Sequence, residues 1–233
     1  MNRSDFKKSG FFAALVPLVC PALFYQAAHG ALSHFLALAG VQQKSAGASC
    51  LLMLPMLWLF SRKGYYNRKK TFKASQALSA AAAVILLSIS AAGATVLMQE
   101  KRICETPSLL LVIGSCIAGP ICEEIVYRGA VFNAAQRFWG RIPALLFSSV
   151  LFGAAHTESV LSAVMAAAAG TVLCTVMIDS QSILIAAAVH CAVNLISFTD
   201  KIYQMPEFVY IFNMIGLIVF LLGMIGKIKI KGE

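Results

Sequence analysis

Three short patterns in the second half of the chain place ionisable and polar side chains inside apolar stretches. Each pattern holds two residues four positions apart, and this spacing puts both side chains on one face of a helix. An ionisable group in apolar surroundings is costly, so each of these residues has either a structural partner or a chemical role. The patterns are EExxxR, from Glu123, Glu124 and Arg128; FxxxH, from Phe152 and His156; and HxxxN, from His190 and Asn194.

The first pattern suggests two different roles for its two carboxylates. Glu124 precedes Arg128 by four residues, the favoured order for a helical ion pair, and a paired charge costs less than two unpaired ones. Glu123 is rotated by about 100° from Glu124 around the helix, so it has no partner in its own helix. Glu123 is therefore the candidate general base for a hydrolytic reaction.

The other two patterns add two histidines and an amide from two further helices. His190 and Asn194 can both donate hydrogen bonds to an oxygen that gains negative charge, and His156 can assist a base. A single histidine in an apolar helix often only bonds a neighbouring helix, and this alternative stays open for each ring. The motifs HExxH, GxSxG, GxGxxG and the Walker loop do not occur, so the reactions that depend on them have no support.

The composition indicates a lipid environment. Of the 233 residues, 59% are hydrophobic and only 12% are charged, too few charges to cover a soluble surface. This excludes a disordered chain and a soluble enzyme. The seven cysteines form no CxxC pair and are interpreted as buried apolar residues. The net charge of +9 comes from clusters between apolar runs, so we expect no nucleic-acid partner.

The apolar runs predict an all-α fold, a polytopic bundle of about eight transmembrane helices. With both termini in the cytoplasm, 14 Lys and Arg residues fall on that side, four on the other, and Arg128 within a span. This asymmetry agrees with the positive-inside rule. The predicted spans are 11–33, 46–61, 76–98, 108–132, 142–157, 160–178, 183–198 and 207–226.

Taken in order, the three patterns resemble the CAAX-protease and bacteriocin-processing family of intramembrane proteases, also called CPBP or Abi. The resemblance covers residues 105–200, including EEIVYRG, LLFSSVLFGAAH and SILIAAAVHCAVN. It divides one integral-membrane domain into motif-free helices at 1–104, a catalytic core at 105–200, and a helix with a basic tail at 201–233.

The resemblance implies an eight-helix bundle with a polar cavity and a role for each motif residue. Glu123 and His156 activate a water molecule, and His190 and Asn194 stabilise the oxyanion. The supporting residues are Glu124, Arg128 and Phe152.

The implied function is an endopeptidase that hydrolyses a bond in a small peptide precursor, such as a bacteriocin, or in a membrane-associated protein. Two alternatives stay open: a non-catalytic immunity or scaffold protein and a proton-coupled transporter. We expect no cofactor, with Zn²⁺ on Glu123, His156 and His190 as the alternative. The expected partners are the lipid bilayer and the substrate, and the expected location is a bacterial plasma membrane.

Overall fold

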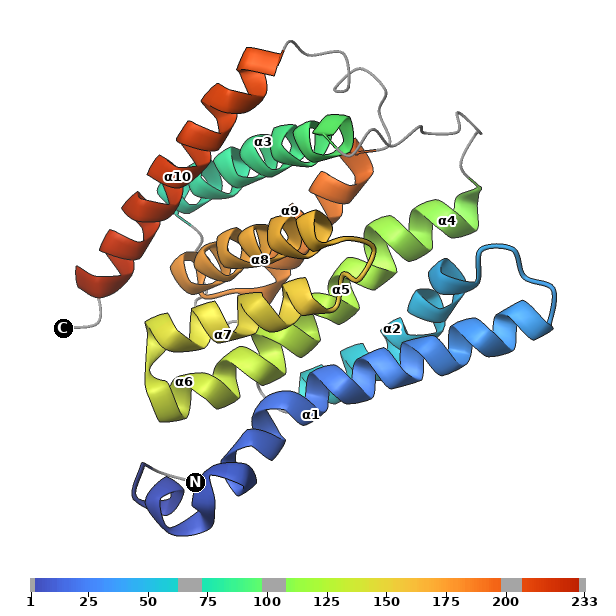
Figure 1. Ribbon diagram of the computed structural model, residues 1–233, viewed down its shortest axis with the longest axis horizontal. Coiled ribbons are helices and arrows are strands. Elements are labelled where there is room, and N and C mark those ends of the chain that lie inside the picture. Colours follow the sequence, from blue (N-terminus) through green and yellow to red (C-terminus); the bar gives the residue numbers. More distant parts are fainter. Residues whose placement is uncertain (1–2, 63–72, 98–107, 198–206, 231–233) are drawn as a thin grey trace.

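The structure, a computed structural model, describes residues 3–62, 73–97, 108–197 and 207–230 (Figure 1). These residues form helices and contain no β-strand, which confirms the all-α prediction. The elements in chain order are α1 (Arg3–Leu38), α2 (Lys44–Arg62), α3 (Ala74–Leu97), α4 (Leu109–Ile113), η1 (Gly114–Ala118), α5 (Gly119–Glu124), η2 (Ile125–Phe132), α6 (Asn133–Trp139), α7 (Arg141–Ala154), α8 (Val160–Ser180), α9 (Ile183–Ile196) and α10 (Glu207–Ile230).

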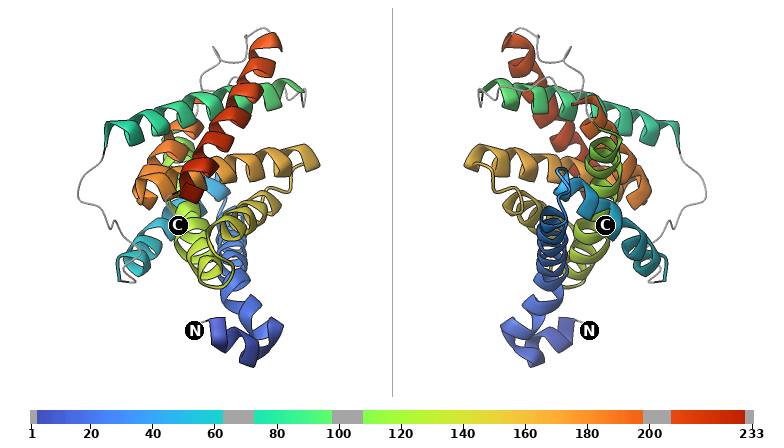
Figure 2. Two further views of the ribbon diagram at one scale, coloured as in Figure 1. Left: turned by 90° about the vertical axis from the view of Figure 1, so that its left-hand side faces the viewer. Right: turned by 90° about the vertical axis from the view of Figure 1, so that its right-hand side faces the viewer.

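One helical segment, Leu109–Trp139, lies at the centre of the fold and contains the elements from α4 to α6. Helices α1 and α2 pack on one side of it, and α7 and α9 pack on the other. Helix α8 packs against both α7 and α9, and α3 and α10 form an outer layer on α8 (Figures 1 and 2). The central segment thus contacts both halves of the bundle and can bring their side chains together.

The central segment is not a uniform α-helix. Elements η1 and η2 are π-helical, and they flank the six-residue α5, which carries Glu123 and Glu124. A π-helical turn uses i→i+5 hydrogen bonds, is wider than an α-helical turn, and occurs frequently at functional sites. The sequence pattern predicts a regular 3.6-residue period throughout this span and contains no sign of the two π segments.

Three described segments are long and apolar enough to cross a membrane: Ala74–Gly93, Leu109–Trp139 and Val160–Ser180. Four shorter apolar helices accompany them, at Lys44–Leu59, Arg141–Ala154, Ile183–Ile196 and Ile215–Met224. These apolar stretches are shorter than the roughly 20 residues that a perpendicular span requires, although α10 as a whole is 24 residues long. The structure therefore supports an integral-membrane bundle, and the count of about eight spans stays a prediction.

Each predicted span overlaps a helix, with differences at the ends. The helix expected to end at residue 157 ends at Ala154, so His156 lies in the connection to α8. The span expected to end at residue 132 continues to Trp139. Most of the basic loop between α2 and α3, and most of the predicted connection before α10, lie outside the described residues.

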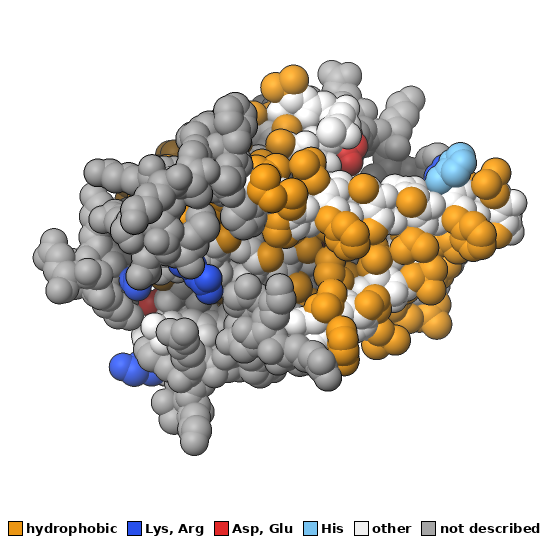
Figure 3. All heavy atoms as spheres, turned by 90° about the horizontal axis from the view of Figure 1, so that it is seen from below, with side chains coloured by type: hydrophobic (Ala, Val, Ile, Leu, Met, Phe, Trp, Pro, Cys, Tyr) orange, Lys and Arg blue, Asp and Glu red, His pale blue; other side chains and the backbone are white. Residues whose placement is uncertain are grey.

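The described surface is rich in hydrophobic side chains. Seen from below, hydrophobic side chains cover much of the described face, and charged side chains are few (Figure 3). Large apolar residues are exposed on several helices, for example Phe24 on α1, Leu54 on α2 and Ile85 on α3. A soluble protein rarely exposes apolar area on this scale, whereas lipid chains would cover it at no cost.

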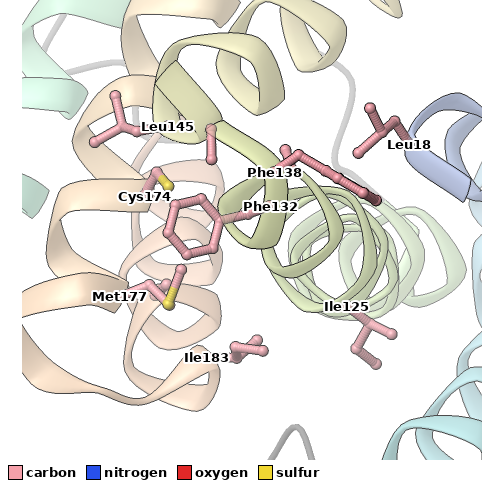
Figure 4. Packing of buried hydrophobic residues seen from close by; sticks show 11 residues of the cluster. Leu18, Ile125, Phe132, Phe138, Leu145, Cys174, Met177 and Ile183 are labelled. Carbon is pink, nitrogen blue, oxygen red and sulfur yellow. The ribbon is translucent and has the colours of Figure 1, made fainter. Parts of the chain in front are cut away.

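A buried apolar cluster joins six elements, α1, η2, α6, α7, α8 and α9, at one end of the central segment (Figure 4). Phe132 of η2 lies at its centre, among Leu145 of α7 and Cys174 and Met177 of α8. Leu18 of α1 packs on the other side of the central segment. This cluster fixes the position of η2 and α6 relative to α7 and α8.

Helices α7 and α8 approach so closely that their contact requires glycine. A Cβ atom on Gly153 would lie 2.5 Å from the carbonyl oxygen of Ala163 and 2.7 Å from the Cβ of Ala167. These are backbone and first-carbon atoms, which cannot move away as a flexible side chain can. The contact holds the C-terminal end of α7, just before His156, against α8.

We predict that Gly153→Ala destabilises the bundle, because the added methyl group must push α7 away from α8. Overpacking of this kind costs about 1–3 kcal/mol. The matched control is Gly223→Ala in α10, where an added Cβ meets no atom within 4 Å. In an α-helix this change is neutral or stabilising by up to about 1 kcal/mol. Thermal unfolding in detergent should separate the variants, and equal melting temperatures would contradict the close contact.

Candidate active site

Glu124 is the centre of a buried charged network. Its Oε1 atom lies 3.1 Å from Nη1 of Arg128, and both side chains are completely buried. The same oxygen accepts a hydrogen bond of 3.0 Å from Nδ1 of His190 on α9. The contact to Arg128 is an ion pair without hydrogen-bond geometry at Nη1. The predicted pairing of Glu124 with Arg128 is therefore present, and Glu124 also contacts a second helix.

Arg128 extends the network to α8. Its Nη2 donates a 3.0 Å hydrogen bond to the carbonyl oxygen of Gly170, and its guanidinium carbon lies 4.6 Å from the ring centre of Phe152. A Cβ on Gly170 would lie 3.4 Å from Nη2 and 3.1 Å from the Phe152 ring, so glycine leaves room for both groups. The small residues of α8 thus allow a charged side chain to reach the backbone.

Phe152 holds the site together from α7. Its ring lies 4.8 Å from the ring of His156 and 5.8 Å from the ring of His190, centre to centre. It also makes an edge-to-face contact of 5.2 Å with Tyr127. Aromatic pairs at these distances are favourable and restrict ring orientation. Phe152 is therefore the physical link between the two histidines.

Glu123 lies near one ring nitrogen of His190, and Glu124 lies at the other. Its Oε2 atom lies 3.8 Å from Nε2 of His190, and 24% of its side chain is exposed. His190 thus has a carboxylate near each ring nitrogen. Among the described residues, no hydrogen bond or ion pair joins Glu123 to His156.

His156 and Asn194 are each oriented by a backbone carbonyl. Nδ1 of His156 donates a 2.9 Å hydrogen bond to the carbonyl oxygen of Phe152, one turn back in the chain. Nδ2 of Asn194 donates a 2.9 Å hydrogen bond to the carbonyl oxygen of Ser115 in η1. The π-helical element η1 therefore orients one of the predicted site residues.

A cavity of about 250 Å³ brings the FxxxH and HxxxN patterns together. Phe152, His156, His190 and Asn194 all line it. The rest of its wall is apolar or small and comes mainly from α3 and α8, with Leu217 of α10. Glu123 is not part of the wall and reaches this region only through His190.

The alternative zinc site requires Glu123, His156 and His190 to converge on one point. In the part of the chain that the structure describes, no group of three or more His, Cys, Asp or Glu side chains is arranged to hold a metal ion. Nδ1 of each histidine donates a hydrogen bond, which leaves Nε2 of each ring as the nitrogen that could bind a metal ion. Because the three side chains do not converge on one point, they do not form a zinc-binding set in this conformation.

Several contacts of the site were not predicted from the sequence. Glu124 and His190, which are in contact, are 66 positions apart in the sequence. The carbonyl oxygens of Gly170 and Ser115 belong to the backbone, so no side-chain pattern identifies them as hydrogen-bond acceptors. The small-residue run AAAAG at 166–170 was a usable sign of close packing on α8.

Comparison with known families agrees with this geometry. Residues 105–196 match the family model described as Type II CAAX prenyl endopeptidase Rce1-like. These residues form an Rce1-like domain. The match confirms the resemblance to the CAAX-protease family, whose members are proteases, and so supports peptidase activity at the level of the family. Neither the curated proteins nor the solved structures contain a significant match to the chain.

We predict that Arg128→Met strongly destabilises the Rce1-like domain, because it leaves the carboxylate of Glu124 buried without its ion-pair partner. Breaking a buried ion pair on one side costs about 3–5 kcal/mol. The control is Arg137→Met on α6, where the arginine is exposed and the expected change is within about 0.5 kcal/mol. Chemical unfolding in detergent measures the change in unfolding free energy for both variants. A similar small change for the two would show that the buried ion pair does not stabilise the fold.

Proposed function

We propose that the protein is an intramembrane endopeptidase in which Glu123, assisted by His156, activates the attacking water. His190 and Asn194 stabilise the oxyanion of the tetrahedral intermediate. The observation that carries this proposal is the shared cavity: His190 and Asn194 face it from α9, His156 faces it from the loop after α7, and Glu123 lies 3.8 Å from His190.

The properties of each group suit these roles. Glu123 is partly exposed, so its carboxylate can meet a water molecule, whereas Glu124 is fully buried and bound to Arg128. One hydrogen of the Asn194 amide is used by Ser115, and the second is left for a substrate oxygen. His156 points its Nε2 away from the carbonyl that binds Nδ1, so this nitrogen can accept a hydrogen bond from water.

We propose a mechanism without a metal ion. Water activation then depends on a carboxylate base, and the oxyanion depends on hydrogen-bond donors in place of a Lewis acid. Metal content of the purified protein, together with activity after treatment with a chelator, tests this. Stoichiometric zinc that is lost in His156 and His190 variants would replace this mechanism with a metalloprotease mechanism.

The proposed substrate is a small peptide precursor, a bacteriocin among the possible classes, or a membrane-associated protein. The name of the matching family refers to prenylated CAAX substrates, so a prenylated peptide is one of the candidate substrates to be tested. The mostly apolar wall of the cavity favours an uncharged segment next to the scissile bond.

The decisive variant is Glu123→Gln, which keeps the shape of the side chain and removes the base. We expect peptide cleavage to fall by about 10²–10⁴-fold, the usual contribution of a general base. The control is Glu158→Gln, in the loop before α8, where the carboxylate accepts a hydrogen bond from Ser162 and is exposed. Expression and melting temperature should be unchanged in both variants.

Other outcomes of the same experiment identify other functions. Full cleavage by Glu123→Gln would reject the proposed base. Protection against a bacteriocin that survives this substitution, without cleavage, would indicate an immunity protein. Proton or solute flux in liposomes that depends on Glu123 would indicate a transporter.

We further propose a bacterial plasma-membrane location with both termini in the cytoplasm. The charge asymmetry of the sequence supports this, and the start of α1 and the end of α10 lie toward the same end of the bundle (Figure 1). Reporter fusions at each terminus should be fluorescent as green fluorescent protein and inactive as alkaline phosphatase. Alkaline phosphatase activity from either terminus would reverse the orientation.

A further inference from the structure

Both histidines of the site donate a hydrogen bond through the same ring nitrogen. Nδ1 of His156 faces a backbone carbonyl at 2.9 Å, and Nδ1 of His190 faces the Glu124 carboxylate at 3.0 Å. A carbonyl can only accept, and so can a carboxylate that is paired with an arginine. Each Nδ1 therefore carries a hydrogen. A neutral imidazole has one N–H, so Nε2 of each neutral ring is a bare acceptor.

This tautomer restricts what His190 can do in catalysis. A neutral His190 cannot donate to an oxyanion through Nε2, because that nitrogen has no hydrogen. It becomes a donor at Nε2 only as an imidazolium, so the oxyanion contact proposed above for His190 also requires the protonated ring. The charged groups that face the ring are suited to this form: Glu124 lies at Nδ1, and Glu123 lies 3.8 Å from Nε2. Arg128, behind Glu124, pairs with that carboxylate and holds it in place.

We infer that His190 is the general acid of the reaction, with Glu124 as the residue that positions it. This inference rests on the proposed endopeptidase function and adds the route of the proton. Glu123 removes a proton from water as the water oxygen bonds to the scissile carbonyl carbon. Glu123 then passes this proton to Nε2 of His190. This transfer returns Glu123 to its ionised form. When the C–N bond breaks, His190 gives the proton to the leaving amine and returns to its neutral form, and the oxyanion becomes the carbonyl of the product acid.

The geometry allows this transfer with little movement. The 3.8 Å separation between Glu123 Oε2 and His190 Nε2 is longer than a hydrogen bond, and one water molecule or a small rotation of the partly exposed carboxylate closes it. His190 itself is held on two sides, by Glu124 and by the Phe152 ring. A fixed ring with a titratable Nε2 between base and cavity is what a proton carrier requires.

The first test measures the tautomer and needs no substrate. The chain has four histidines, so ¹⁵N-histidine labelling gives a small set of ring signals, and His190→Gln identifies the signal of His190. We expect the neutral His190 ring to carry its hydrogen on Nδ1. A hydrogen on Nε2 of the neutral ring would overturn the inference, since His190 could then donate to an oxyanion without receiving a proton.

The second test compares a cleaved peptide with its depsipeptide analogue, in which an ester oxygen replaces the scissile N–H. An amine must be protonated to leave, whereas an alkoxide leaves more easily, so a general acid matters more for the amide. We expect His190→Gln to reduce amide cleavage by about 10²–10⁴-fold and ester cleavage at least tenfold less. Glu124→Gln should change the amide-to-ester ratio in the same direction, which a purely structural loss would not do.

Asn194→Ala is the matched control, because an oxyanion donor acts equally on both substrates. We expect it to reduce amide and ester cleavage by a similar factor of about 10²–10³. Equal losses on both substrates for His190→Gln would overturn the general-acid role and leave His190 as an oxyanion donor only. If the unmodified protein cleaves no peptide, the proposed function fails with the general-acid role, and the tautomer measurement alone still tests whether Glu124 positions His190.

Discussion

A single carboxylate oxygen, Oε1 of Glu124, connects the parts of the site. It lies between the guanidinium of Arg128 and the ring of His190, and all three groups are removed from solvent. Ionised groups in such surroundings are tolerated only when they are paired, so each of the three restricts where the others can be. The central segment and α9 are held together by this contact, while Arg128 binds α8 through Gly170. The position of His190 relative to Glu123 and the cavity follows from these contacts.

Much of this arrangement could be predicted from the sequence, because helical spacing fixes which residues share a face. The pairing of Glu124 with Arg128 and the shared orientation of His190 and Asn194 are both present. The assignment of Glu123 and Glu124 to different environments is also correct in geometry, since one is partly exposed and the other is fully buried. Their catalytic roles stay predictions.

The contacts between helices could not be predicted in the same way. The sequence contains no sign that His190 binds Glu124 through one nitrogen and faces Glu123 with the other, because that depends on how α9 packs against α5. The sequence predicts a helix to residue 157, whereas α7 ends at Ala154, and His156 lies in a connection where its ring is oriented by its own backbone. The π-helical elements were missed because i→i+5 bonding leaves no regular apolar period to detect.

The two π-helical elements change the angular relation between the side chains at the two ends of the central segment. Each π turn holds about one residue more than an α turn, so it offsets the angular phase of everything beyond it by about 100°. The residues before η1 pack on α2, and those of α6 pack on α1 and α7. These two sets of residues therefore do not lie at the relative angle that one continuous α-helix would give them. Helix α5 lies between the two π-helical elements, so the angular position of its two carboxylates around the helix axis differs from what either neighbouring part of the segment would give. The central segment is thus divided into two helical parts of different angular phase, with the two carboxylates between them.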